Sequence, residues 1–337
     1  MEFRTLRRRT ALIAAAALAL PLAGCGSGHS VAGLNPTART PVTVQAGFIP
    51  VIDVAALYLG EKKGFFAGRG IDLKINTAQG GAALVPPVMT GEYQFGFSNI
   101  VSLLSARSEG LPLKVIASGS SSTAVAGKDV TMIRVPQNSP ITSAADLAGK
   151  KVSVNTLNNL LQLLAEVSVT AAHGDADSVQ FVELPFPDAV TALGNGNIDA
   201  MVTAEPFDTV AAGKNTRVIA SPYLDLSASS LTTSAYFTSE QQLEQNPRLF
   251  ATIKAAIDES LTYANTHTEE TRAQLASFMK IDPAVARKVI LPTFSPAIPR
   301  ASIDTFVKAA KQFHLIGDDV SSTDVTYNDL VWSGSAG

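Results

Sequence analysis

Cysteine and histidine are both scarce in this sequence. Cys25 is the only cysteine among 337 residues, so the chain can form no disulfide within itself, although an exported protein could use them. Of the four histidines, His173, His267 and His314 fall on separate predicted helices, with no acidic or cysteine cluster beside them. We therefore expect no metal site and no cofactor.

Catalytic motifs and excess positive charge are also missing. The sequence has no Gly-x-Ser-x-Gly elbow, no His-Glu-x-x-His motif and no P-loop, because Gly127-Lys128 and Gly149-Lys150 lack the flanking residues of the last. Its 26 basic and 29 acidic side chains give a net charge of −3. An acidic chain without a basic patch binds nucleic acid poorly. We expect neither an enzyme nor a nucleic-acid partner.

The N-terminal segment has the composition of an export signal. Residues 1–24 combine a basic start, an apolar run from Thr10 to Leu22 and the small residues Ala23 and Gly24. The apolar run is shorter than the roughly 20 residues that a transmembrane helix needs. The arginines favour twin-arginine export, whereas Ala11 stands where that motif usually has a large apolar residue, so the export route stays open.

Leu22-Ala23-Gly24-Cys25 resembles the bacterial lipobox. The resemblance implies cleavage before Cys25, lipidation of its thiol and amine, and anchoring on the outer face of the bacterial cytoplasmic membrane. The alternative is an ordinary signal peptide that happens to contain a cysteine. Residues 25–40 are rich in Gly, Ser, Thr and Pro, and we expect them to form a flexible tether after the lipidated cysteine.

The rest of the chain alternates apolar strands with helices, which predicts an α/β fold with largely parallel sheets. The expected strands of the first stretch are 42–48, 71–75, 95–97 and 113–117, and those of the second are 151–154, 179–182, 198–203 and 217–220. Two further β-rich stretches, 129–135 and 231–237, are expected to connect the lobes as a hinge.

These patterns predict two lobes and a helical C-terminal part. Lobe 1 is expected to comprise 41–130 and 231–330, and lobe 2 to comprise 131–230. After Ser239 we expect helices at 241–266, 269–279, 283–290 and 302–313, with the first kinked or restarted at Asn246-Pro247.

Ligands of open parallel sheets bind beyond the carboxyl ends of the strands. Those positions are poor in charge here and rich in Asn, Ser, Thr, Gln and Gly, and several begin helices, whose free N–H groups suit an anion. Structural roles are the alternatives to ligand contact for some of these residues. Asp53, Ser98 and Thr156 could cap helices, and Phe48 could belong to the core. The asparagines at 155, 158 and 159 exceed what one cap requires.

The stretches GFIPVIDVAALYLGEKKGFFAGRGIDLKI and QGGAALVPPVMTGEYQFGFSN resemble the first lobe of substrate-binding proteins of ABC importers, in the group for nitrate, sulfonate, taurine and thiamine-precursor pyrimidines. DLAGKKVSVNTLNNLLQLL and ALGNGNIDAMVTAEPF resemble the second lobe. The resemblance implies a two-lobed periplasmic-binding-protein fold of type II, with two crossovers. The implied ligand contacts are Phe48, Pro50, Asp53, Gln79, Gly80, Gly81, Ser98, Asn99, Asn155, Thr156, Asn158 and Glu205.

By this resemblance the protein is an exported, monomeric solute-binding component of an ABC importer. It would capture a small polar or anionic solute, such as a sulfonate, taurine or nitrate, and dock on a permease with its ATPase. Asp53 and Glu205 would repel a doubly charged anion, so a thiamine-precursor-like pyrimidine or other heterocycle is the alternative ligand. An enzyme on the same fold and a surface sensor lipoprotein are the alternatives from other classes.

The anchor at Cys25 can be tested directly. Replacing Cys25 with Ser removes the thiol that would carry the lipid, so we expect the protein to leave the membrane fraction for the soluble fraction, measured by immunoblot after fractionation. Unchanged membrane retention would contradict the anchor.

Overall fold

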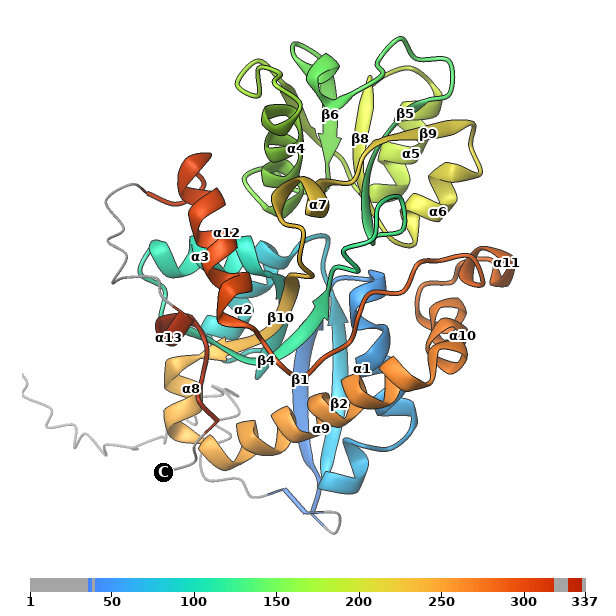
Figure 1. Ribbon diagram of the computed structural model, residues 1–337. Coiled ribbons are helices and arrows are strands. Elements are labelled where there is room, and N and C mark those ends of the chain that lie inside the picture. The colour runs from blue at the N-terminus through green and yellow to red at the C-terminus, as the bar shows by residue number, and fades with distance from the viewer. Residues whose placement is uncertain (1–35, 38–39, 318–326, 335–337) are drawn as a thin grey trace, which may run out of the picture.

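The computed structural model describes residues 36–37, 40–317 and 327–334, and the signal, Cys25 and most of the predicted tether lie outside this part. Within it, the strands form two five-stranded sheets, each the centre of one lobe (Figure 1). The order of sheet 1 is β2 (Ile71–Thr77), β1 (Val42–Phe48), β3 (Phe95–Asn99), β10 (Thr232–Ser239), β4 (Leu113–Ser121). The order of sheet 2 is β7 (Gln180–Glu183), β6 (Lys151–Val154), β8 (Ala200–Ala204), β5 (Thr131–Pro136), β9 (Thr216–Ala220).

One strand in each sheet runs against the others. β1 pairs in parallel with β2 and β3, and β6 pairs in parallel with β7 and β8. β10 is antiparallel to β3 and β4, and β5 is antiparallel to β8 and β9. The predicted largely parallel sheets are therefore confirmed, but each contains an antiparallel strand that the sequence did not predict. Both are the first strand after a crossing between lobes.

Lobe 1 packs helices on both faces of sheet 1. The early helical elements are η1 (Ile52–Val54), α1 (Ala55–Lys62), η2 (Ala67–Arg69), η3 (Gly81–Leu84), α2 (Val85–Met89) and α3 (Ile100–Ser108). The C-terminal ones are α8 (Glu240–Gln245), α9 (Pro247–Thr266), α10 (Thr268–Phe278), α11 (Pro283–Ala286), α12 (Arg300–Gln312) and α13 (Tyr327–Leu330). α9 and α10 pack on α1, while α12 packs on α3 and also reaches α4 of the second lobe (Figure 1).

Lobe 2 carries η4 (Ala144–Leu147), α4 (Leu160–Ala171), α5 (Phe186–Gly194), α6 (Phe207–Ala212) and α7 (Pro222–Leu226). α4 shows why a helix forms here. Asn159 accepts a hydrogen bond from the Leu161 N–H and caps the helix, and Leu160, Leu163 and Leu164 are buried on one face.

The C-terminal helices largely follow their expected positions. The break at Asn246-Pro247 is confirmed, since α8 ends before it and α9 begins at the proline. The helix expected over 283–290 is wrong, because α11 ends at Ala286. The following segment makes tertiary bonds instead: the Ile290 N–H donates to Glu205, and Thr293 exchanges backbone hydrogen bonds with Ser121.

Aromatic rings fill the centre of lobe 1. Phe48 is fully buried and lies 5.8 Å from the ring of Phe95 and 5.9 Å from that of Tyr236, centroid to centroid. Phe97 packs 5.3 Å from Tyr236. Burying a phenylalanine side chain stabilises a fold by about 1.5–3 kcal/mol. Phe48 is therefore core, and the expectation that it forms cleft wall is not supported.

Lobe 2 contains a buried ion pair between its sheet and α6. Arg134 on β5 donates from Nε to Oδ1 of Asp208 at 2.5 Å and from Nη2 to Oδ2 at 2.8 Å. Both side chains are buried, at 9% and 5% exposure. The two-point geometry satisfies both charges, but loss of one partner would leave the other buried and uncompensated.

Replacing Arg134 with Met should destabilise the protein by about 3–5 kcal/mol, because Asp208 would remain buried without its partner. The double replacement Arg134→Met with Asp208→Leu should recover most of that loss, since no buried charge remains. Urea unfolding followed by circular dichroism measures both. A double variant as unstable as the single one would show that the charge is not the cause.

Candidate ligand-binding site

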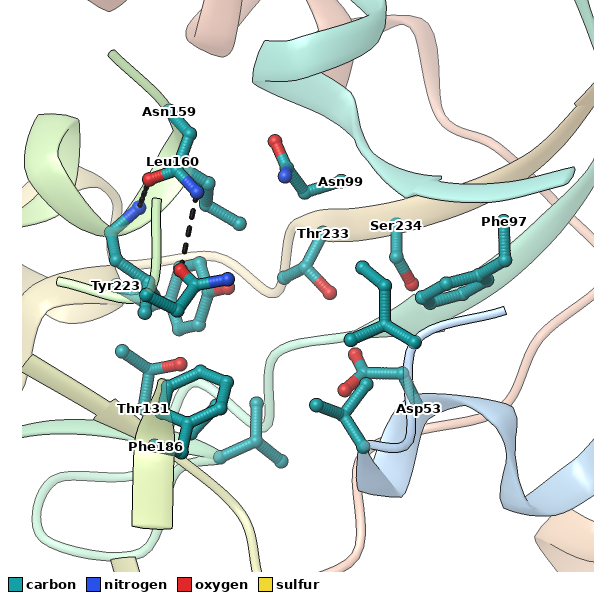
Figure 2. A pocket seen from close by; sticks show the side chains of 16 residues that line it. Asp53, Phe97, Asn99, Thr131, Asn159, Leu160, Phe186, Tyr223, Thr233 and Ser234 are labelled. Atoms are coloured by element: carbon teal, nitrogen blue, oxygen red, sulfur yellow. Dashed lines mark hydrogen bonds between the residues drawn. The ribbon is translucent and has the colours of Figure 1, made fainter. Parts of the chain in front are cut away.

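A cavity of about 60 Å³, open at its mouth, lies between the two sheets. Both lobes contribute to it (Figure 2). The polar and aromatic lining from lobe 1 is Asp53, Phe97, Asn99, Thr233 and Ser234, and that from lobe 2 is Thr131, Asn155, Asn159, Phe186 and Tyr223. Ile49, Val51, Leu160 and Leu161 are among the aliphatic residues that complete the wall.

The strand directions explain why these residues meet. Asp53, Asn99 and Asn155 follow or end strands β1, β3 and β6, as expected for ligand sites of parallel sheets. Thr131 and Thr233 stand instead at the beginnings of β5 and β10. Because those two strands are antiparallel to their neighbours, their first residues reach the same edge.

Asp53 is the acidic group of the cavity. The sequence suggested that it caps a helix, but it lies inside η1, and α1 has Val54 at its N-cap position without a side-chain cap. Ser120 Oγ donates to its carboxylate, and the same hydroxyl lies 3.1 Å from Thr233 Oγ1 and 2.9 Å from Ser234 Oγ. Burial raises the pKa of Asp53 above its usual value, and the Asp129 carboxylate adds to the rise.

Amide side chains form another part of the wall. Asn159 Nδ2 donates to Asn155 Oδ1 at 3.2 Å, while Asn159 Oδ1 accepts from the Leu161 N–H at 3.1 Å (Figure 2). Asn99 caps α3 by accepting from the Ser102 N–H at 2.8 Å. The caps of these two helices are thus Asn99 and Asn159, and each capping side chain also faces the cavity.

Aromatic rings approach from both lobes. Phe186 is held by a stacked Phe207, with centroids 5.1 Å apart and an interplanar angle of 14°. Phe97 comes from the opposite lobe (Figure 2). Tyr223 is buried and also lines the cavity, and burial raises the pKa of its hydroxyl well above the usual value, with Asp53 and Asp129 adding to the rise. The cavity therefore offers flat apolar faces beside its polar groups.

Of the contacts that the resemblance implied, Asp53, Asn99 and Asn155 line this cavity. Gly80 and Thr156 meet where the lobes touch: a Cβ on Gly80 would lie 2.5 Å from Thr156 Oγ1. Glycine at position 80 therefore permits the close approach of the two lobes.

The remaining implied contacts lie outside the lining. Phe48 is core, Gly81 is packed against the buried Ser98, and Pro50 is partly buried. Gln79 and Asn158 are exposed. Asn158 has a left-handed backbone with φ of 52°, which asparagine tolerates, and its N–H donates to Gln162 Oε1 at 2.9 Å. These features give the asparagine a structural role in the turn before α4.

Glu205 joins the lobes instead of lining the cavity. Its fully buried side chain accepts from Thr209 Oγ1 at 2.9 Å within lobe 2 and from the Ile290 N–H of lobe 1 at 3.0 Å. Its carbonyl oxygen accepts from the Ile52 N–H of lobe 1 at 3.2 Å. Burial raises the pKa of Glu205 to about 7, and Asp208 adds to the rise.

Sequence reasoning missed much of the lining. Thr131, Thr233 and Ser234 were missed because their strands were not recognised as antiparallel. The available signal was the hydroxyl-rich run 232–234, which faces a second such run at 118–122 in the paired strand. Phe186 and Tyr223 begin helices and gave no signal that separates cavity wall from core.

In the part of the chain that the structure describes, no three His, Cys, Asp or Glu side chains gather as metal ligands. No helix of this part combines the length and the apolar character needed to cross a membrane.

Two α/β lobes, two crossovers and a cavity between the lobes define the periplasmic-binding-protein fold of type II. The chain belongs to the NMT1/THI5-like family, whose model matches residues 51–271. The bicarbonate-binding protein CmpA of Synechococcus elongatus is 25% identical over 240 residues, which cover 61% of this chain and 53% of CmpA. The chain thus spans about half the length of that relative.

Solved structures show the same fold. The periplasmic aliphatic sulphonate binding protein SsuA from Escherichia coli superposes with a TM-score of 0.68 at 20% identity, covering 86% of this chain and 99% of SsuA. The desulfurization enzyme DSZB superposes with a TM-score of 0.57 at 17% identity, covering 81% and 93% of the two chains. At these identities the likeness concerns the fold alone.

The buried Glu205 predicts a pH dependence of stability. Its pKa is about 7 in the fold against 4.5 for an unburied glutamic acid, so the folded state binds the proton more tightly. Its stabilising effect is complete below pH 4.5 and is lost as the pH rises through 7, a change on the order of 3 kcal/mol.

Glu205→Gln imitates the protonated acid and should reduce the fall in unfolding free energy between pH 4.5 and 7.5. The measurement is urea unfolding across that range. Glu92→Gln, at an exposed position, is the control and should follow the original protein. Identical pH profiles for Glu205→Gln and the original protein would refute the assignment.

Proposed function

We propose that the protein is the extracytoplasmic solute-binding component of an ABC importer. It captures a small polar solute by closure of the two lobes and presents it to a permease and its ATPase. The observation that carries this proposal is the cavity itself, which takes its wall from both lobes, so that a ligand in it contacts both and favours the closed arrangement.

Family membership supports the proposal. CmpA and SsuA, to which this chain is similar, are binding proteins for bicarbonate and for aliphatic sulphonates, respectively. The signal-like segment before Cys25 and the lipobox-like residues support export and anchoring on the outer face of the cytoplasmic membrane. A monomer tethered there stays near its permease.

Catalysis on the same fold is the competing function, as the name of DSZB illustrates. The lining of the described cavity includes no histidine, cysteine, lysine or arginine that could act as base, nucleophile or electrophile. This composition favours binding over chemical conversion. Recovery of a bound ligand unchanged after prolonged incubation separates the two.

The sequence resemblance suggested two classes of ligand, namely a sulfonate-, taurine- or nitrate-like solute and a pyrimidine-like heterocycle. The rings of Phe97 and Phe186, one from each lobe, favour the second, because a planar ligand can pack against aromatic faces.

A thermal-shift panel tests the function. A solute that binds only the folded protein stabilises it by about 2.7 kcal/mol at 100 times its Kd, so at least one member should raise Tm. The panel comprises taurine, alkanesulfonates, nitrate, bicarbonate, aminopyrimidines and benzamidinium. No shift with any member would count against solute binding.

Gly80→Ala tests closure. The added methyl group would meet Thr156 Oγ1 and hold the lobes apart, so the ligand found in the panel should bind at least tenfold more weakly in calorimetry. Gly68→Ala is the matched control, because its methyl group would meet nothing within 4 Å. Equal affinities of the two variants would contradict closure at this contact.

A further inference from the structure

The charge of the cavity has one sign. Asp53 is the only acidic residue in its wall, and no lysine, arginine or histidine of the described chain lines it. The other polar groups of the wall are the neutral amides and hydroxyls of residues such as Asn99, Asn155 and Thr233. A free anion bound here would meet Asp53 without a compensating cation.

A second acidic side chain, Asp129, lies near Asp53. Asp129, on the first crossing, is fully buried and interacts electrostatically with Asp53. Its Oδ1 accepts from the Thr123 and Val130 N–H groups, whereas its Oδ2 has no hydrogen-bond partner among the described residues. Asp53 in the wall thus has a second carboxyl group near it, and the wall contains no described cation.

The local bonds leave Asp53 able to accept more hydrogen bonds. Ser120 Oγ donates to Oδ1, and the Ser234 hydroxyl and the Asp53 backbone N–H also stabilise the carboxylate, whereas a carboxylate can accept about four hydrogen bonds. The carboxylate points into the cavity beside Ser234 (Figure 2). A charge left in such a site is costly unless it is paired.

We propose that the ligand carries a cationic, hydrogen-bond-donating group that pairs with Asp53, on a planar or apolar body that lies against Phe97 and Phe186. This inference rests on the proposed solute-binding function and specifies its ligand as a cation or a zwitterion bound through its cationic end. An amidinium suits the site because it is planar and donates two parallel N–H bonds to one carboxylate.

The test uses three probes of one shape and different charge: benzamidinium, benzamide and benzoate. Isothermal titration calorimetry on the purified protein should give benzamidinium at least a tenfold tighter Kd than benzamide, and no measurable binding of benzoate. Asp53→Asn should weaken benzamidinium at least tenfold and leave benzamide unchanged, because it removes the charge and keeps the shape. Glu92→Gln removes an exposed charge of the same lobe and should bind all three as the original protein does.

Several results would overturn the proposal. These are benzoate binding as tightly as benzamidinium, benzamide matching benzamidinium, an unchanged preference in Asp53→Asn, and no binding of benzamidinium at millimolar concentration. The thermal-shift panel distinguishes failure of the cationic-ligand proposal from failure of the solute-binding function. If sulfonates, nitrate or bicarbonate raise Tm while benzamidinium does not, the solute-binding function stands and the cationic ligand is refuted.

Discussion

The arrangement of the molecule depends on two strands that cross between the lobes before they enter a sheet. β5 follows the first crossing and pairs with β8 and β9, while β10 follows the second and pairs with β3 and β4. The crossings are themselves hydrogen-bonded, since the Ser122 N–H donates to the Leu231 carbonyl and the Leu231 N–H donates to Ser122 Oγ, both at 2.9 Å. A short paired segment of this kind is what a hinge between two lobes requires.

The same crossings set the chemistry of the cavity. Ser120 lies near the end of β4, just before the first crossing, and Thr233 and Ser234 lie near the start of β10, just after the second. Their hydroxyl groups form the network that contacts Asp53. The position of the acidic group therefore depends on the residues that bring the lobes together. A change in hinge geometry would also change the hydrogen bonds and solvation of Asp53.

Much of the fold could be predicted from apolar runs and turn residues. The parallel strands are short, buried and separated by helices, and this pattern is visible in sequence. The direction of β5 and β10 was not visible, because parallel and antiparallel strands buried on both faces have the same composition. The failure of the helix prediction over 283–290 has a related cause, since the Ile290 N–H is taken by Glu205, a residue 85 positions away.

In the candidate site, too, some residues could be predicted from the sequence and others could not. Asn99 and Asn155 could be predicted because they follow strands whose carboxyl ends meet in space. Asp53 and Glu205 looked equivalent in sequence, since each is an acidic residue soon after a buried strand. Only the packing separates them: Asp53 lines the cavity, whereas Glu205 is fully buried and bonded to both lobes. Phe48 and Phe97 belong to neighbouring strands, yet only Phe97 is part of the wall.

Asp53 and Glu205 should also make ligand binding and lobe closure depend on pH in opposite directions. The Ile52 N–H bonds to the Glu205 carbonyl, and Ile52 precedes Asp53, so both groups lie at the contact between lobes. We expect closure to bury Glu205 and so to raise its pKa, which would favour the closed form at lower pH. A cation at Asp53 would lower the pKa of that carboxyl, which favours binding at higher pH. If binding and closure occur together, the affinity for a cationic solute passes through a maximum, at a pH set between the titration of Asp53 and that of Glu205.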